Sequence, residues 1–357
     1  MYSPLHISRK LNFIPLSWAG ATEQQDYLNL GDALSPVIVA ALSQKEIKRV
    51  SMRSSAPRIS STGSILSNFV GGKIDVWGSG MSPTYNPMTK EHTGYKYPPS
   101  TKIYPRCLRG PFTQYILERS GVEFDFSPGY GDPVILLKSF YNPYDIQANK
   151  KYELGVVIHL SETDGRSLDS TAFDHIARYK VPAHMQNSVR IINTLSGISS
   201  IGLKSKIDEI LQCKRIISTS FHGLLLAELY NIPCMYVHNS VGGLKYAQIS
   251  LENEQEIDIR FLDFFLSVEL AKRCYYCQPK NEYTDWESLI MDIDRSWEPL
   301  QISPNQLIET FPLDLNPLKA FKGESLSFFN DSRISSIPFQ GNPTKISDFS
   351  KSLSHLS

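Results

Sequence analysis

The chain has 357 residues, of which 41% are hydrophobic and 20% are charged, proportions that are ordinary for a globular protein. Its 36 basic and 36 acidic residues cancel, so its charge gives no reason to expect nucleic acid or an anionic membrane as partner. No apolar run reaches the roughly 20 residues that span a bilayer, and the N-terminus lacks the apolar core of a signal peptide. We therefore expect a cytoplasmic protein, and its length favours two domains.

Five cysteines, an odd number, are scattered through the sequence at positions 107, 213, 234, 274 and 277. This pattern favours free thiols over a disulfide framework. Cys274 and Cys277 have the spacing of zinc ligands, but no second pair and no histidine cluster accompanies them. We therefore predict no metal site.

Short strands and helices alternate through the first part of the chain. Ser35-Pro36 predicts the start of a helix that runs to about Gln44, because serine suits the N-cap and proline the first helical position. Asn29-Leu30-Gly31-Asp32 would then be a polar loop before that helix. A second helix is expected from Pro111 to a C-terminal cap at Gly121. Candidate strands in this part are residues 48–52, 74–77 and 103–104.

Polar residues between about Ser139 and Tyr152 indicate a domain junction, and a second alternating series follows. We predict a first domain over residues 1–145, a second over 146–315, and a C-terminal segment over 316–357 that wraps a domain and ends in a partly disordered tail. The elements expected in the second domain are strands at 154–159, 188–192, 215–218 and 233–237 and helices at 204–213 and after Ser220.

Strands that alternate with helices predict an α/β fold with parallel sheets, in which ligands bind at the carboxyl ends of the strands. Several polar signatures lie at such ends. They are Asn29 to Asp32, Gly78-Ser79-Gly80, Arg109-Gly110-Pro111, Ile158-His159, and Ser218-Thr219-Ser220-Phe221-His222-Gly223.

The last of these signatures is the most informative. An apolar run ends in three hydroxyl residues, a histidine-glycine pair follows, and an apolar helix begins. The first amides and the macrodipole of a helix attract anions, so a phosphorylated ligand beside His222 is one reading. The other reading is an ordinary strand-to-helix turn with a capping hydroxyl and a packed histidine.

In order and spacing these signatures resemble the polysaccharide pyruvyltransferase family, over roughly residues 10–270. The matching segments are Asn29-Leu30-Gly31-Asp32, Gly63-Ser64-Ile65-Leu66, Val76-Trp77-Gly78-Ser79-Gly80, Leu108-Arg109-Gly110-Pro111, Gly131-Asp132-Pro133, Ser218 to Leu224, Asn231-Ile232-Pro233 and Arg260-Phe261-Leu262-Asp263-Phe264-Phe265. One position departs, because many relatives carry an arginine two residues before the histidine, where this chain has Ser220.

The resemblance implies two Rossmann-like domains that face a cleft, as in the GT-B architecture. It also implies that pyruvate passes from phosphoenolpyruvate to two hydroxyls of a glycan sugar as a cyclic ketal, in surface polysaccharide synthesis and with no cofactor. The acceptor side and part of the donor site would lie in the first domain, with the main donor site at Ser218 to Gly223. The expected partners are phosphoenolpyruvate and a glycan or lipid-linked oligosaccharide.

Such chemistry needs a proton donor, cations for the donor anion, and a base for the hydroxyls. We predict His222 as the acid. We predict that Arg109 and Arg106 bind the anion, that Arg260 replaces the absent arginine, and that Ser218, Thr219 and Ser220 contact phosphate or cap the helix. Asp32 either activates a sugar hydroxyl or bonds to its loop. Further candidates for substrate contact are Asn29, Gly31, Gly78, Ser79, Gly80, Gly223 and His159.

Two alternatives stay open at this point. A GT-B glycosyltransferase would use a nucleotide sugar, because a fold does not fix a chemistry. A glycan-binding protein without activity is the other, with Ser220 as its support. We also consider peripheral contact with the inner face of a membrane through Phe328 and Phe329, which could equally pack on the protein.

Overall fold

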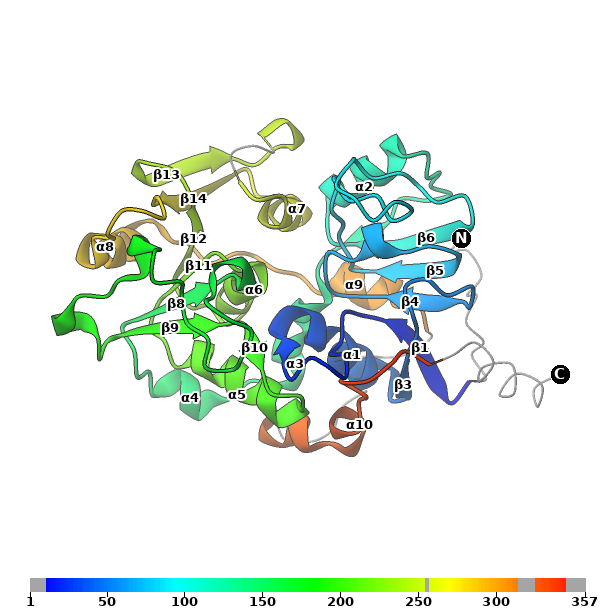
Figure 1. The fold of residues 1–357 in the computed structure, drawn as a ribbon, viewed down its shortest axis with the longest axis horizontal. Helices are drawn as coiled ribbons and strands as arrows, with labels where there is room; N and C mark the ends of the chain where they lie inside the picture. The colour runs from blue at the N-terminus through cyan, green and yellow to red at the C-terminus, as the bar shows by residue number, and fades with distance from the viewer. Residues whose placement is uncertain (1–10, 254–256, 314–324, 345–357) are drawn as a thin grey trace. The chain divides into compact units, whose positions relative to one another are not determined.

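The computed structural model describes residues 11–253, 257–313 and 325–344. The chain forms two compact units, and each has its own six-stranded sheet (Figure 1). The first unit contains residues up to 25, 31–140 and those from 303 onward, and the second contains 26–30 and 141–302. The mixed α/β architecture predicted from the alternation of strands and helices is confirmed.

The sheet of the first unit has the order β3-β1-β4-β5-β6-β7, and all its neighbouring strands are parallel. The elements of this unit are β1 (Phe13–Ser17), α1 (Leu30–Ser43), β3 (Glu46–Arg49), β4 (Arg58–Ser60), η1 (Leu66–Asn68), β5 (Gly72–Trp77), β6 (Thr101–Leu108), α2 (Pro111–Arg119), β7 (Gly129–Tyr130), η2 (Pro133–Leu136), α3 (Leu137–Phe140), α9 (Asn305–Thr310), η8 (Ser325–Asn330) and α10 (Ser332–Ser335).

The central strand β5 shows how helices cover both faces of this sheet. Val76 belongs to a buried apolar cluster that includes Leu117 of α2. The next residue, Trp77, points to the other face, since side chains alternate along a strand. Its Nε1 donates to the Leu307 carbonyl of α9 at 2.9 Å, and its ring meets Phe311 edge-on at 4.8 Å. α2 and α9 therefore lie on opposite faces of the sheet.

The predicted start of α1 is wrong. The helix begins at Leu30, so Gly31 and Asp32 form its first turn, and Pro36 lies inside it. An internal proline removes one hydrogen bond and crowds the preceding turn. Burial outweighs this cost, because Leu34, Val37 and almost every other side chain of α1 are buried.

Two other boundaries in the first unit differ from the prediction. β3 begins and ends earlier than the expected strand at 48–52. β6 extends to Leu108 rather than ending at Tyr104, so Arg106 is a strand residue. β6 continues through Arg106 because this side chain is buried and paired with Asp75, so its charge does not end the strand.

The sheet of the second unit has the order β13-β14-β12-β11-β8-β9, parallel except for the antiparallel pair β13-β14. All four strands predicted here are present, whereas the pair β13-β14 is not predicted by the sequence patterns. The elements are β2 (Leu28–Asn29), α4 (Tyr144–Ala148), β8 (Leu154–Ile158), η3 (Leu160–Glu162), η4 (Ala177–Tyr179), η5 (Ala183–Met185), β9 (Val189–Asn193), β10 (Leu195–Ser196), α5 (Ser200–Leu211), β11 (Ile216–Ser218), α6 (Phe221–Leu229), β12 (Cys234–His238), β13 (Gly243–Gln248), η6 (Leu251–Asn253), α7 (Ile259–Ser267), β14 (Lys272–Cys277) and α8 (Trp286–Ser296).

Neighbouring side chains of strand β8 point to opposite faces of this second sheet. Val156 packs in the apolar cluster that contains Leu289 of α8. Val157 faces α6, where a Cβ added to Gly223 would lie 2.5 Å from its Cγ1. Gly223 therefore lets α6 approach the sheet closely, which is a packing role for a residue predicted to contact substrate.

All five cysteines are free and buried. Cys274 and Cys277 both lie on β14, where residues three apart point to opposite faces of the strand. Their spacing, which suits zinc in a turn or helix, therefore does not bring the two thiols together here. Among the described residues, no group of three or more histidine, cysteine or acidic side chains gathers as metal ligands would.

Phe328 and Phe329 are fully buried in the first unit, and Phe328 stacks on Phe140 with ring centroids 5.5 Å apart. Membrane contact through these two side chains is therefore wrong. No helix within the described ranges is long and apolar enough to cross a membrane. The predicted tail after residue 344 lies outside the described residues.

The turn after β5 gives a prediction on stability. Gly78 has φ +93°, and a Cβ there would lie 2.1 Å from Pro133, whereas Gly94 has the same φ with open space around it. We expect Gly94→Ala to cost about 1–2 kcal/mol of unfolding free energy, from the left-handed backbone alone. Gly78→Ala should cost clearly more, because the clash adds to that strain. Urea unfolding of both variants measures the difference, and equal costs would contradict this view of the turn.

Candidate functional site

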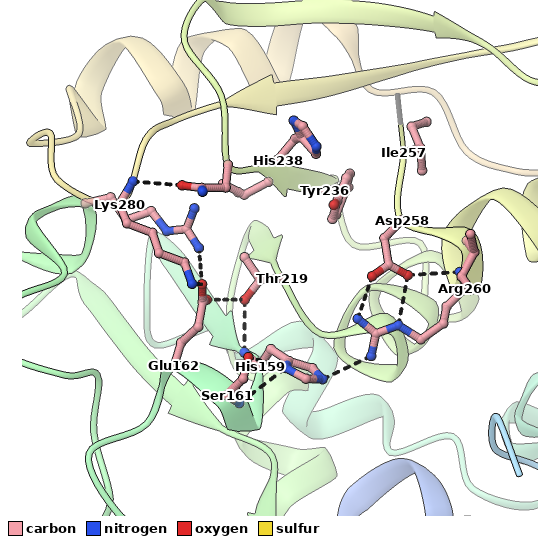
Figure 2. A pocket seen from close by; sticks show the side chains of 14 residues that line it. His159, Ser161, Glu162, Thr219, Tyr236, His238, Ile257, Asp258, Arg260 and Lys280 are labelled. Atoms are coloured by element: carbon pink, nitrogen blue, oxygen red, sulfur yellow. Dashed lines mark hydrogen bonds and ion pairs between the residues drawn. The ribbon is translucent and has the colours of Figure 1, made fainter. Parts of the chain in front are cut away.

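Three neighbouring parallel strands of the second unit, β8, β11 and β12, end at the same edge of the sheet, and a cavity of about 470 Å³ lies there (Figure 2). The loops after these strands form its wall together with the start of α7 and the segment after β14. This is the position at which parallel α/β sheets bind ligands. The lining residues are His159, Ser161, Glu162, Arg178, Thr219, Tyr236, Val237, His238, Asn239, Ile257, Asp258, Ile259, Arg260 and Lys280.

Thr219 connects two of these strand ends. Its hydroxyl accepts a hydrogen bond from the backbone amide of His159 at 2.9 Å and donates to the Glu162 carboxylate at 3.0 Å. Since Thr219 follows β11 and His159 follows β8, this one side chain fixes the two loops to each other. Thr219 was predicted to contact phosphate, and the structure gives it this positioning role at the cavity wall.

Arg260 is fixed at the start of α7 by the residue two before it. Asp258 is the N-cap and accepts from the Arg260 amide at 2.9 Å. Its two oxygens also accept from the guanidinium, from Nε at 2.9 Å and from Nη2 at 2.8 Å. This fork-to-fork geometry orients the remaining nitrogen, Nη1, toward His159 Nε2 at 3.0 Å (Figure 2).

His159 is neutral in this arrangement. Burial and the charge of Arg260 lower its pKa from the ordinary value to about 4, although Asp258 and Glu162 act in the opposite direction. A neutral imidazole carries one N–H. Two donors face the ring, Arg260 Nη1 at Nε2 (3.0 Å) and the Ser161 amide at Nδ1 (3.2 Å), and a neutral ring can accept from only one of them. The charged and shorter contact is the stronger, so Nε2 accepts from Arg260 and the proton belongs on Nδ1, 2.8 Å from the Ser161 hydroxyl.

The opposite part of the wall is built around Glu162, which is 4% exposed. Its carboxylate receives Arg178 and the Tyr179 hydroxyl, and Lys280 Nζ lies 2.9 Å away. Burial alone would raise the pKa of Glu162, but Arg178, Tyr179 and Lys280 outweigh burial and leave this pKa below its ordinary value. The carboxylate therefore stays charged and holds two cations at the cavity.

The charges of the lining favour an anionic ligand. Three cationic side chains, Arg178, Arg260 and Lys280, face two carboxylates. Both carboxylates are bonded to these cations, and three positive charges against two negative ones leave one net positive charge at the wall. Of the residues predicted to contact substrate, the cavity brings together His159, Thr219 and Arg260.

The other residues of the Ser218-to-Gly223 signature begin α6. Ser220 is the N-cap without a side-chain capping bond, while the buried Ser218 hydroxyl accepts from the Ser220 amide at 3.0 Å. His222 is the second residue of α6, with its ring 4.9 Å from that of Phe221, and it is not among the residues that line the cavity. The Ser218 hydroxyl therefore stabilises the turn before α6 rather than capping the helix, and the acid role of His222 stays a prediction.

In the first unit, the buried side chain of Arg109 lies over the Gly78-Ser79-Gly80 turn. A Cβ on Gly80 would be 2.2 Å from its Cζ, so any larger residue there would displace the guanidinium. Arg109 Nη1 donates to the Ser64 hydroxyl at 2.6 Å, and Ser79 lies 2.6 Å from Ser60, hydroxyl to hydroxyl. The Gly78-Ser79-Gly80 turn and Arg109 lie at the carboxyl ends of β5 and β6, as the sequence predicts.

Asp32 lies beside another of the motifs. A Cβ on Gly63, whose φ is +110°, would be 2.8 Å from Asp32 Oδ1. Gly31 precedes it in the first turn of α1, whereas Asn29 pairs with Leu195 in the second unit. Roles for Asp32, Gly31 and Asn29 in substrate contact stay predictions.

Arg106 has a structural partner. Its Nε donates to Asp75 at 2.7 Å, and both side chains are buried in the first unit. The ion pair with Asp75 accounts for this buried arginine, and its contact with a donor anion stays a prediction.

Sequence reasoning missed Glu162, Arg178, Asp258 and Lys280. Asp258-Ile259-Arg260 did carry a signal, because an aspartate just before a helical run is a capping residue. Glu162, Arg178 and Lys280 come from short 3₁₀ segments and the turn after an unpredicted strand, where no periodicity marks them.

The sequence model of the family described as "Polysaccharide pyruvyl transferase" matches residues 57–240, just over half of the chain. The chain belongs to this family. The predicted resemblance is confirmed, and so is the prediction of a transferase enzyme that acts on polysaccharide. Comparison with curated proteins and with solved structures gave no match. The matched range of this transferase contains His159, Thr219 and His222, while Asp258, Arg260 and Lys280 lie beyond it.

The buried pair in the first unit gives a testable consequence. Arg106→Leu should cost about 3–5 kcal/mol of unfolding free energy, because it leaves the Asp75 carboxylate buried without its partner. Asp75→Leu should cost a similar amount, and the double variant should cost less than the sum of the two. Chemical denaturation of the four proteins measures this coupling. A stable Arg106→Leu protein that has lost phosphoenolpyruvate binding would instead restore Arg106 to the donor site.

Proposed function

We propose that this enzyme moves pyruvate from phosphoenolpyruvate onto two hydroxyls of a glycan sugar as a cyclic ketal. The observation that carries the proposal is the cation-lined cavity of the second unit, in a chain of the polysaccharide pyruvyl transferase family. Phosphoenolpyruvate is small and carries two anionic groups, a phosphate and a carboxylate. Arg260 at one part of the wall, and Arg178 with Lys280 at the other, are the cations proposed to receive these two groups.

The chemistry defines what the residues must supply. Protonation of the donor methylene carbon makes C2 electron-poor, and one sugar hydroxyl adds there. Phosphate then leaves, and the second hydroxyl closes the ketal. Of the two hydroxyl protons released, one balances the proton delivered to carbon and the other leaves with phosphate. Cations at the phosphate stabilise its departure.

His222 is the proposed proton donor, as the family resemblance implies, and Asp32 is the proposed base. Arg260 and His159 are proposed to bind the phosphate. The acceptor is proposed to be a glycan or lipid-linked oligosaccharide, and the reaction to occur in the cytoplasm. Proton transfer by a placed side chain contributes about 10²–10⁴-fold to a rate, which sets the loss expected on its removal.

The test is phosphate release from phosphoenolpyruvate by wild type and His222→Ala, with galactose-, glucose- and mannosamine-type acceptors. We expect acceptor-dependent release that falls by at least about 100-fold in the variant. Equal release by both proteins would remove His222 from the acid role and keep the reaction. If a nucleotide sugar raised the melting temperature and phosphoenolpyruvate did not, the proposed donor would be wrong.

A further inference from the structure

We propose that His159 is a proton-binding residue of the cavity: a dianionic oxyanion binds between Arg260 and His159, and His159 takes up one proton at Nε2 in the same step. The inference deepens the proposed function, since a donor phosphate would be the natural ligand. It concerns the binding of the anion, whichever molecule carries it. The proton uptake by His159 does not depend on whether the pyruvyl group is transferred.

Nε2 of His159 faces the guanidinium of Arg260. Arg260 Nη1 lies 3.0 Å from this nitrogen, so the two can bond only while Nε2 has a lone pair. A proton on Nε2 would set an N–H against an N–H and a cation against a cation. The contact with Arg260 therefore keeps His159 neutral, with its one proton on Nδ1 beside the Ser161 hydroxyl.

The charges that face His159 come from three segments. Arg260 and Asp258 are at the start of α7, Glu162 is in η3, and Arg166 follows η3. The end of β11 contributes only the uncharged Thr219 hydroxyl. Two cations and two carboxylates nearly balance, so burial and the close approach of Arg260 dominate, and the pKa falls to about 4.

An oxyanion bound between Arg260 and His159 would make the protonated form of His159 the favoured one. Arg260 Nη1 turns its N–H from Nε2 to the anion, and Nε2 is released to carry a proton of its own. A proton from solvent forms the new N–H bond, which donates to a second oxygen of the anion. Two negative charges beside the ring favour the imidazolium, so the cavity gains a cation only when a dianion occupies it. A monoanion provides half of this stabilisation and should bind more weakly.

Sulfate is the probe, because it keeps both charges through the pH range used, whereas phosphate itself titrates there. Between about pH 7.5 and about pH 5.5, the wild-type dissociation constant for sulfate should fall by up to about tenfold per pH unit, the limit for one linked proton. Calorimetry in two buffers of different ionisation enthalpy should show uptake of close to one proton. This second measurement needs no variant.

His159→Gln keeps an oxygen that accepts from Arg260 but cannot take up the proton, so its sulfate affinity should not change with pH. The matched control is His238→Gln. His238 lines the same cavity, but its Nδ1 contacts the Ser240 hydroxyl at 2.9 Å rather than a cation. His238→Gln should keep the pH dependence of the wild type.

Three results would overturn the inference. They are sulfate binding without proton uptake in the wild type, unchanged proton uptake in His159→Gln, and no sulfate binding at any pH. Failure of the proposed function would look different. If sulfate bound with a proton but phosphoenolpyruvate neither bound nor turned over, His159 would keep its role and the donor would be wrong. If phosphoenolpyruvate turned over without proton uptake on binding, only the inference on His159 would fall.

Discussion

The buried carboxylate of Glu162 connects four segments of the second unit around the cavity. It receives Arg178 and the Tyr179 hydroxyl from one stretch of chain, Thr219 from the end of β11, and Lys280 from beyond β14. A buried carboxylate is costly unless such donors surround it, so the loops must keep their places for Glu162 to remain charged. Through Thr219, the same contact fixes the His159 amide at the end of β8. The positions of Arg178 and Lys280 therefore depend on this one acid.

Asp258 holds the third cavity cation, Arg260, and the chain has a second pair with the same geometry. At the start of α10, Asp331 accepts from the amide of Arg333 at 2.9 Å and binds its guanidinium with both oxygens, in the same spacing. The motif of an N-cap aspartate that binds the arginine two residues later therefore occurs twice in the described residues. What distinguishes Arg260 is its position at a cavity wall and the histidine that faces its third nitrogen.

Much of the fold follows from the sequence, because the buried strands β8, β11 and β12 are apolar runs bounded by polar turns. The errors have physical causes. Pro36 predicts a helix start by local rules, but α1 begins six residues earlier because its side chains are buried. Arg106 lies within β6 because it forms a buried ion pair with Asp75. His159 and Thr219 could be predicted as site residues because they follow strands, and Arg260 because it matches a motif of the family. Glu162 and Arg178 could not, because their roles arise only when distant segments meet.

The measurement that tests the account most directly is calorimetric titration of phosphoenolpyruvate into wild type, Arg260→Ala and Arg333→Ala. Both variants lose the same local pairing with an aspartate cap, but only Arg260 lines the cavity. One charge-assisted contact contributes about 1.5–3 kcal/mol, so Arg260→Ala should weaken binding by about 10- to 150-fold. Arg333→Ala should bind as the wild type does. Equal affinities in all three proteins, or no binding by any, would contradict the assignment of this cavity to the donor.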